Sequence, residues 1–269
     1  MSSPPVALTI AGSDPSGSSG LQADLPTFAA MGVHGTSAIT VVTAQDTTGV
    51  KAFHELDRSL VLAQIEHLVD DLPPAASKTG LLRDAAVVDA VASRSTAGRL
   101  GALVVDPVLV DSTGKPIVDD AAIAAYRSLA DGAAVLTPNR WEAELLGGAP
   151  FGDTPSDELA AALLALGSDV VVVTGGRGHD DEVVDHVITA DGMTVLESRR
   201  VGTAPIRGTG CTFSAALTAT IARGEEPAAA PAVAHAFVQQ QLRHLDALQL
   251  GSGRPGLPHV LRPEGGPRT

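Results

Sequence analysis

A glycine-rich turn before a predicted helix is the strongest chemical feature of the sequence. It reads Gly208-Thr209-Gly210-Cys211, and the apolar segment after it extends to Ala222. Two glycines let backbone amides point into one concavity, and a helix N-terminus adds unpaired N–H groups and the positive end of the helix dipole. Such a site suits a phosphoryl group whose negative charge must be stabilised during transfer. The same field would lower the pKa of the Cys211 thiol and make it a candidate base, although a plain turn before a small buried cysteine has the same pattern.

Three further polar residues could recognise a ligand or a metal ion. The Gln45 side chain offers a carbonyl and an amide in one plane, which matches an aromatic ring with an amino group beside a ring nitrogen. Asp106 and Glu142 could organise Mg²⁺, which binds through few carboxylates and many waters. Ordinary roles compete with each interpretation: a surface amide for Gln45, and helix capping or solvation for the two acids.

A second glycine-rich loop spans residues 12–20, after the first predicted strand and before the first helix. It does not match the dinucleotide-binding pattern Gly-x-Gly-x-x-Gly, and the chain contains no P-loop. The loop could let the backbone approach a small ligand, or it could be an ordinary turn between a strand and a helix.

The elements that must position these residues alternate along most of the chain, with β-rich runs between longer segments of helical period. This alternation predicts one α/β domain, with a mainly parallel sheet and helices on both faces. In the second helix Leu60, Ile65 and Leu68 are expected to face inward, and Pro26 is awkward in the first helix unless it lies in the first turn. Strands are predicted over residues 6–11, 37–44, 78–80, 103–107, 134–136 and 170–174, and helices over 21–31, 60–69, 85–93, 121–129, 138–146, 157–166, 211–222 and 228–248.

The alternation is predicted to change at one place, a hairpin over residues 183–199 whose turn is Ala190-Asp191-Gly192. We find no internal repeat and no long linker, so residues 1–250 are predicted to form a single domain. Residues 251–269 are rich in Gly, Pro and Arg and are predicted to be a surface tail.

The predicted strands end in chemically suggestive residues. In an open α/β sheet, ligands bind at the carboxyl ends of the strands, so one cleft is expected there. The strand ends are Gly12-Ser13-Asp14, Gln45-Asp46, Lys78-Thr79-Gly80, Asp106-Pro107, Thr137-Pro138-Asn139 and Thr174-Gly175-Gly176.

Composition narrows the class of protein. The 269 residues include 18 basic and 31 acidic side chains, a formal charge of −13, which argues against a nucleic-acid partner. The single cysteine excludes a disulfide framework and a multi-cysteine metal site. No apolar run approaches the ~20 residues that span a bilayer, and the first residues lack the basic region of a signal peptide. We therefore expect a cytoplasmic enzyme.

Taken together, these motifs resemble the hydroxymethylpyrimidine/phosphomethylpyrimidine kinase family of thiamine biosynthesis, within the ribokinase-like superfamily. The resemblance covers nearly the whole chain in order and spacing. It implies a three-layer α/β/α fold, a kinase that uses ATP and Mg²⁺, and a homodimer. The matching segments are Leu8-Thr9-Ile10-Ala11-Gly12-Ser13-Asp14-Pro15-Ser16-Gly17, Thr43-Ala44-Gln45-Asp46-Thr47, Lys78-Thr79-Gly80, Val105-Asp106-Pro107-Val108, Thr137-Pro138-Asn139, Thr174-Gly175-Gly176 and Gly208-Thr209-Gly210-Cys211-Thr212-Phe213-Ser214-Ala215-Ala216.

The resemblance also implies roles for individual residues. The substrate would be 4-amino-5-hydroxymethyl-2-methylpyrimidine and then its monophosphate. The implied roles are Cys211 as general base, Gly208, Thr209 and Gly210 as the anion hole, Gln45, Gly12, Leu81, Val108 and Asp24 as the pyrimidine site, Asn139, Thr174, Gly176 and Arg207 near the ATP phosphates, and Asp106 and Glu142 around Mg²⁺.

Two departures from the family pattern put part of this in doubt. Members usually carry Lys at the position of Thr174, where it neutralises the transferring phosphate, and commonly carry His at the position of Arg207. We hypothesise that Arg177 or Arg207 supplies the missing charge. A pyridoxal or pyridoxine kinase is one alternative, although Gln45 favours the aminopyrimidine edge. A catalytically weak, ligand-binding paralogue is another.

Overall fold

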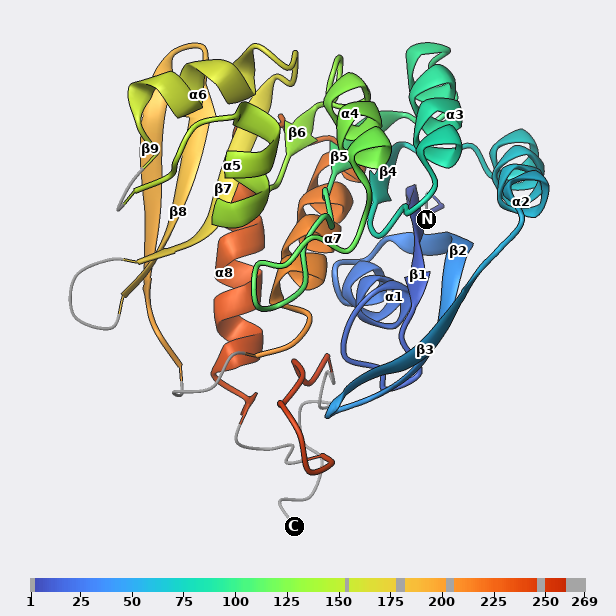
Figure 1. The fold of residues 1–269 in the computed structure, drawn as a ribbon. Helices are drawn as coiled ribbons and strands as arrows, with labels where there is room; N and C mark the ends of the chain where they lie inside the picture. Colours follow the sequence, from blue (N-terminus) through green and yellow to red (C-terminus); the bar gives the residue numbers. More distant parts are fainter. Residues whose placement is uncertain (1–2, 153–154, 178–181, 202–205, 246–249, 260–269) are drawn as a thin grey trace.

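A nine-stranded sheet forms the centre of the computed structural model, which describes residues 3–152, 155–177, 182–201, 206–245 and 250–259 (Figure 1). The strand order is β3-β2-β1-β4-β5-β6-β7-β8-β9. Strands β2, β1, β4, β5, β6 and β7 pair in parallel, whereas β3, β8 and β9 add antiparallel edges. The strands are β1 (Val6–Ser13), β2 (His34–Asp46), β3 (Gly49–Glu55), β4 (Ala76–Thr79), β5 (Ala102–Val105), β6 (Val135–Leu136), β7 (Val170–Arg177), β8 (Glu182–Thr189) and β9 (Gly192–Arg199).

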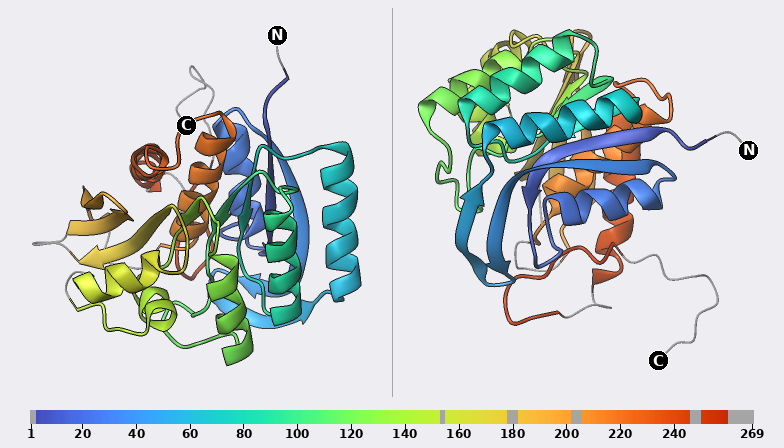
Figure 2. Two further views of the ribbon diagram at one scale, coloured as in Figure 1. Left: turned by 90° about the horizontal axis from the view of Figure 1, so that it is seen from above. Right: turned by 90° about the vertical axis from the view of Figure 1, so that its right-hand side faces the viewer.

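Helices cover both faces of the sheet and enclose two apolar cores (Figures 1 and 2). Along β1, Leu8 and Ile10 pack into the core under α2–α6, whereas Ala7 packs into the core under α1, α7 and α8. This alternation follows from the period of two in a strand. The three-layer α/β/α prediction is therefore confirmed. The helices are α1 (Leu21–Ala30), α2 (Arg58–Asp71), α3 (Ala85–Thr96), α4 (Asp120–Leu129), α5 (Arg140–Gly147), α6 (Asp157–Leu164), α7 (Thr209–Ala222) and α8 (Ala230–Leu242).

Strand β3 was not predicted, and the statement that the alternation changes at one place is wrong. It pairs antiparallel with β2, so the chain has a hairpin near each edge of the sheet. All residues of β3 except Gly49 are exposed. An edge strand without a buried face lacks the alternation of apolar and polar residues by which strands are recognised.

Three helix details also differ from expectation. Leu60 is 52 % exposed, contrary to the prediction, whereas Ile65 is buried and Leu68 packs against the core as predicted. Val61 and Val69 are buried beside Ile65. Pro26 lies in the second turn of α1, not in the first. Helix α8 ends at Leu242 rather than at residue 248. None of the helices in the described ranges is long and apolar enough to cross a membrane.

Candidate active site

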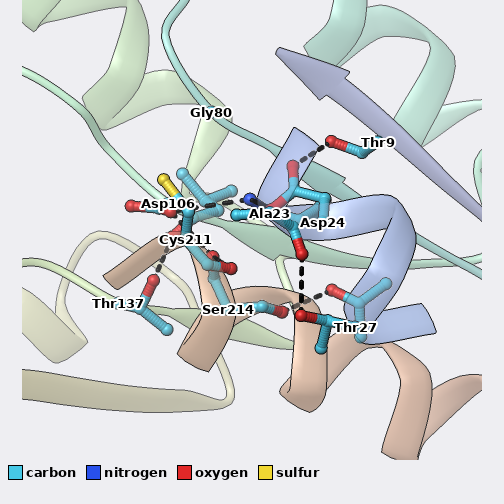
Figure 3. A network of polar contacts seen from close by, with 12 residues as sticks. Thr9, Ala23, Asp24, Thr27, Gly80, Asp106, Thr137, Cys211 and Ser214 are labelled. Carbon is cyan, nitrogen blue, oxygen red and sulfur yellow. Dashed lines mark hydrogen bonds and ion pairs between the residues drawn. The ribbon is translucent and has the colours of Figure 1, made fainter. Parts of the chain in front are cut away.

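Three charged side chains lie together beneath the carboxyl ends of the central strands, and we call Asp24, Lys78 and Asp106 the buried charge cluster. Lys78 Nζ, from β4, lies 2.9 Å from Asp24 Oδ1 on α1 and 3.7 Å from Asp106 Oδ2 after β5. The Thr9 hydroxyl donates to Asp24 Oδ2 over 2.7 Å, and the Ser214 hydroxyl of α7 donates to Asp106 Oδ2 over 2.7 Å (Figure 3). The cluster therefore joins β1, α1, β4, β5 and α7.

The cluster is buried, and its charges are coupled. The side chains of Asp24 and Lys78 are fully buried, and that of Asp106 is 9 % exposed. Burial lowers the pKa of Lys78, but attraction to Asp24 and Asp106 outweighs it and leaves the pKa above its usual value. Burial raises the pKa of Asp24 despite the nearby ammonium. Such ions persist in an interior because they pair, and removal of one partner exposes the others to an unfavourable environment.

Cys211 lies in the first turn of α7, next to Asp106 (Figure 3). Burial raises the pKa of its thiol to about 12. Lys78 and an N–H from Gly20 lower the pKa, whereas Asp106 and Asp24 raise it. The sequence-based expectation of a lowered thiol pKa is therefore wrong. Two carboxylates accompany the single ammonium, and burial outweighs the field of the helix N-terminus.

The glycine turn before Cys211 does cap a helix, as predicted. Gly208 is the N-cap residue of α7 and has a φ of +79°. A Cβ at this position would clash with the carbonyl oxygen of Ser18, in the other glycine-rich loop. Glycine is therefore required at position 208 for two reasons, the backbone conformation and the close contact between the two loops. The contact fixes the N–H groups of the turn relative to the carboxyl end of β1.

The residues expected to hold the pyrimidine ring lie at the ends of four adjacent strands. Gln45 is in β2, Gly12 is in β1, Leu81 follows β4 and Val108 follows β5. A Cβ on Gly12 would come within 4.0 Å of Leu81 Cβ, so the structure brings these two together. The fifth, Asp24, is fully buried and both of its oxygens already have partners, so neither oxygen is free to contact a ligand directly.

Glu142 and Asn139 form a capping box at the start of α5. The Asn139 side chain accepts from the backbone N–H of Trp141 and of Glu142, and Glu142 Oε2 accepts from Asn139 N over 2.9 Å. Its other oxygen accepts from Leu109 N over 3.2 Å. Burial raises the pKa of Glu142 to about 8, opposed by the Asn139 N–H and reinforced by Asp106. The capping alternative is thus confirmed for Glu142.

A cleft of about 560 Å³ lies between the end of the sheet at β7–β9 and helices α7 and α8. Of the predicted residues, Asn139, Thr174, Thr209 and Gly210 line it. Arg140, Arg199 and Arg200 also line it and bring positive charge. Thr209 and Gly210 belong to the first turn of α7, so this turn forms part of the cleft wall.

Two arginines, Arg177 and Arg207, were proposed to replace the charge of the family lysine. The side chain of Arg177 lies outside the described part of the structure, as does the burial of Gly176. The Arg207 guanidinium donates to the Asp46 carbonyl over 2.7 Å and lies 3.6 Å from Asp14 Oδ2. Arg207 is not among the residues that line the cleft, and these contacts join the two glycine-rich loops.

The described part of the predicted tail contacts the same region, beside the β2–β3 hairpin (Figure 1). Arg254 N donates to the Thr47 carbonyl over 2.9 Å, and Pro255 accepts from Arg207 N over 2.8 Å. Leu257 is buried, and His259 Nε2 lies 2.7 Å from the Thr212 hydroxyl, one residue after Cys211. Residues 251–259 are therefore anchored to the site, although a boundary at residue 250 stays a prediction.

Sequence reasoning missed Lys78, although it quoted the motif that contains this residue. A signal was present: Lys78 stands in a strand whose four residues are all buried, and lysine is rarely buried without a charged partner. Ser214 was quoted in the same way without a role, and its partner Asp106 lies more than a hundred residues earlier in the chain.

A three-layer α/β/α fold, with a glycine turn that begins α7 at the carboxyl edge of the sheet and an adjoining cleft, is that of a ribokinase-like phosphotransferase. The family model described as "Phosphomethylpyrimidine kinase" matches residues 14–257. A Synechococcus elongatus protein named hydroxymethylpyrimidine/phosphomethylpyrimidine kinase is 42 % identical over 95 % of this chain and 97 % of its own length. The chain belongs to the phosphomethylpyrimidine kinase family.

Solved structures agree with this assignment. The phosphomethylpyrimidine kinase of Clostridium difficile superposes with a TM-score of 0.76 at 32 % identity, covering 88 % of this chain and 98 % of that one. An ADP complex of Bacillus subtilis pyridoxal kinase superposes with a TM-score of 0.81 at 35 % identity, covering 89 % and 92 %. The fold is thus shared by kinases named for phosphomethylpyrimidine and for pyridoxal.

Proposed function

We propose that this kinase transfers the γ-phosphoryl group of ATP to the hydroxymethyl group of 4-amino-5-hydroxymethyl-2-methylpyrimidine, and then phosphorylates the monophosphate for thiamine biosynthesis. One observation carries the proposal. Thr209 and Gly210 line the 560 Å³ cleft, whereas Cys211, the next residue, lies beside Asp106 and within the field of the buried charge cluster. The N-terminus of α7 therefore faces both a nucleotide-sized cleft and a second site, as direct transfer between two substrates requires.

In the second site, Gln45 would bind the aminopyrimidine edge while Gly12, Leu81 and Val108 enclose the ring. The planar amide of Gln45 supplies one donor and one acceptor, which pair with the ring nitrogen and the amino group. Asp24 would act through Lys78, because its two oxygens are occupied by Thr9 and Lys78.

During transfer, the backbone N–H groups of Gly208, Thr209 and Gly210 would stabilise the charge on the phosphoryl oxygens. Cys211 would accept the proton of the hydroxymethyl group. Its raised pKa, about 12, makes the thiolate a minor form at neutral pH, so we expect the rate to rise with pH. Asn139 and Thr174 would contribute to the phosphate end of the cleft, with Gly176 following in the same strand. Arg207 would act from outside the cleft, by holding the glycine turn through Asp46 and Asp14.

Asp106 and Glu142 would hold Mg²⁺ through its waters. The two acids fit this role because carboxylate oxygens suit Mg²⁺, and Asp106 follows β5 while Glu142 lies in the first turn of α5. Burial raises the pKa of Glu142, Asp106 reinforces the shift, and a cation would favour the ionised form of both acids. Among the described residues, no group of three or more His, Cys, Asp or Glu is placed to hold a metal ion. When bound, the ion neutralises phosphate charge.

We also propose a homodimer that acts in the cytoplasm on small molecules, without a nucleic-acid or membrane partner. The β2–β3 hairpin exposes Val42, Val50 and Phe53, which are 43 %, 56 % and 51 % accessible. The register pairs Val42 with His54 and Thr43 with Phe53, so Val42 and Phe53 lie on opposite faces of the hairpin. The exposed face that carries Phe53 is the candidate interaction surface. Light scattering after size exclusion should give a dimer for the wild type and a monomer for Phe53→Asp.

A coupled assay of ADP release tests the activity. The protein receives Mg-ATP with the hydroxymethylpyrimidine, its monophosphate or pyridoxal, and Cys211→Ala is the control. We expect kcat/KM to be highest for the two pyrimidines. A higher value for pyridoxal would favour the second candidate, which the Bacillus subtilis neighbour named pyridoxal kinase suggests. Ligand binding without ADP release would favour the ligand-binding paralogue.

A further inference from the structure

The turn at Gly175, in the wall of the cleft, is supported by a side chain instead of a neighbouring strand. The pairing of β7 with β8 shifts register between Val173 and Gly176, and Gly175 has a φ of +74°. A bulge of this kind leaves an extra residue without a ladder partner. Here the Gly175 N–H donates to Asp185 Oδ1, on β8, over 2.9 Å. A carboxylate therefore fixes the turn.

Asp185 also connects this turn to the opposite wall of the cleft. Its other oxygen, Oδ2, lies 3.0 Å from His235 Nδ1 on α8. A carboxylate can only accept, so Nδ1 carries the proton of this hydrogen bond. The side chains are 11 % and 12 % exposed, and His235 Nε2 is buried without a partner among the described residues. Asp185 is therefore the polar contact that orients the imidazole.

We propose that Asp185 and His235 are positioning residues for the nucleotide. They hold the Gly175 turn, and with it Thr174, in place in the wall of the cleft. Thr174 N donates to Pro138 O over 2.9 Å, so the same strand end is aligned with Asn139, another cleft residue. The inference rests on the proposed use of this cleft for ATP. Asp185 and His235, which lie outside the family motifs, would thus align Thr174 and Asn139 on the phosphate side of the cleft.

The charge of Asp185 makes the pairing with His235 necessary. An unpartnered carboxylate in a cleft that takes a nucleotide would repel its phosphates. Here the Gly175 N–H and the His235 N–H each occupy one oxygen, so the negative charge is turned into the wall. Loss of His235 alone should therefore harm nucleotide binding, and a neutral acceptor at position 185 should relieve part of that harm.

Trp141 gives a direct readout without turnover. It is the single tryptophan of the chain, it lines the cleft and it is 39 % exposed, so its fluorescence should change when ADP binds. We expect Asp185→Ala to raise the Kd for ADP about tenfold, since a hydrogen bond to a charged group is lost. Asp185→Asn, which keeps an acceptor for Gly175, should raise it less. His235→Ala should raise it severalfold, and the double variant His235→Ala/Asp185→Asn should bind ADP more tightly than His235→Ala.

Controls separate this proposal from a general loss of structure and from failure of the proposed function. Asp191→Ala removes an exposed carboxylate from the turn of the β8–β9 hairpin and should leave the Kd unchanged. The KM for the pyrimidine should stay within twofold of wild type in every variant. The inference is overturned if Asp185→Asn and Asp185→Ala bind ADP as the wild type does, or if pyrimidine KM rises in parallel. If the wild type itself does not bind ADP, the proposed function fails instead.

Discussion

The two ends of the proposed active site handle charge in different ways. At the proposed pyrimidine end, Asp24 and Lys78 are fully buried and each has charged or hydroxyl partners. In the nucleotide cleft, Arg199 and Arg200 are exposed, and the carboxylate of Asp185 is turned into the wall by two N–H groups. A buried ionic arrangement is costly to disturb, whereas exposed charges are screened by water and salt. Changes at the first end should therefore affect folding and catalysis together, and changes at the second should affect nucleotide affinity.

The largest effect is expected at Cys211, where the two ends meet. Cys211→Ala should lower kcat by roughly 10²- to 10⁴-fold, the usual contribution of a positioned base, with no change in the Kd for ADP. Because the thiol pKa is raised to about 12, kcat of the wild type should rise about tenfold per pH unit between pH 7 and 9. Steady-state kinetics across this range checks both. A variant with more than a tenth of wild-type kcat would show that Cys211 is not the base.

The buried charge cluster gives the next largest effect. Lys78→Met leaves two carboxylates without their ammonium, and we expect unfolding free energy to fall by about 3–5 kcal/mol. Denaturant unfolding measures this, and Asp24→Asn in the same chain should restore part of the loss. Arg99→Met is the matched control, since Arg99 Nη2 lies 2.6 Å from Asp70 Oδ1 at the surface, and it should cost under about 1 kcal/mol. Equal losses for the two variants would remove the distinction between buried and exposed charge.

Features of the fold that follow from local periodicity can be predicted from the sequence, whereas the partners of buried charges cannot. The alternation of β-rich and helical segments predicts the three layers, and the strand-end residues predict which side chains converge, because both follow from local periodicity and chain direction. The partners of Lys78 cannot be predicted this way, since Asp24 and Asp106 meet it through long-range packing. The sign of the Cys211 shift depends on the sum of burial and three charges, which no local motif contains.

Two further features that the sequence does not predict are strand β3 and the anchoring of residues 251–259. Apart from Gly49, the β3 residues are exposed and carry no burial pattern, so local periodicity gives no signal for a strand there. The segment 251–259 has the composition of a free tail, yet backbone contacts with Thr47 and Arg207 anchor it. Backbone hydrogen bonds of this kind do not depend on residue type and leave little trace in a sequence.

Acidification should destabilise the contact between His259 and Thr212, near Cys211, before it affects the nucleotide cleft. Burial lowers the pKa of His259 to about 4, from an ordinary value of 6.5. The folded state therefore resists protonation, so stability is fully present above pH 6.5, falls as pH decreases toward 4 and is constant below it. At about 1.4 kcal/mol per pKa unit, the loss should reach roughly 3–4 kcal/mol.

The variant His259→Asn isolates this effect. His259 has a φ of +43°, which asparagine tolerates well, so the backbone can be kept while the titrating group is removed. The difference in stability between wild type and variant should shrink from pH 7 to pH 4, measured by denaturant unfolding. As His259 loses its contact with Thr212, kcat should fall at pH 5 while the Kd for ADP holds. A pH-independent difference between the two proteins would contradict the lowered pKa.

The smallest effect should come from restoring the family lysine in the nucleotide cleft. Thr174 lines the cleft at the end of β7 and is partly exposed, so Thr174→Lys would add an ammonium near the transferring phosphate. We expect kcat/KM for ATP to rise about tenfold at low salt and the gain to shrink as ionic strength increases. Thr174→Met is the matched control for size and should show no gain. If the lysine and methionine variants are equal, the charge missing at position 174 is already supplied by other groups, and Arg140, Arg199 and Arg200 are the cleft residues to replace next.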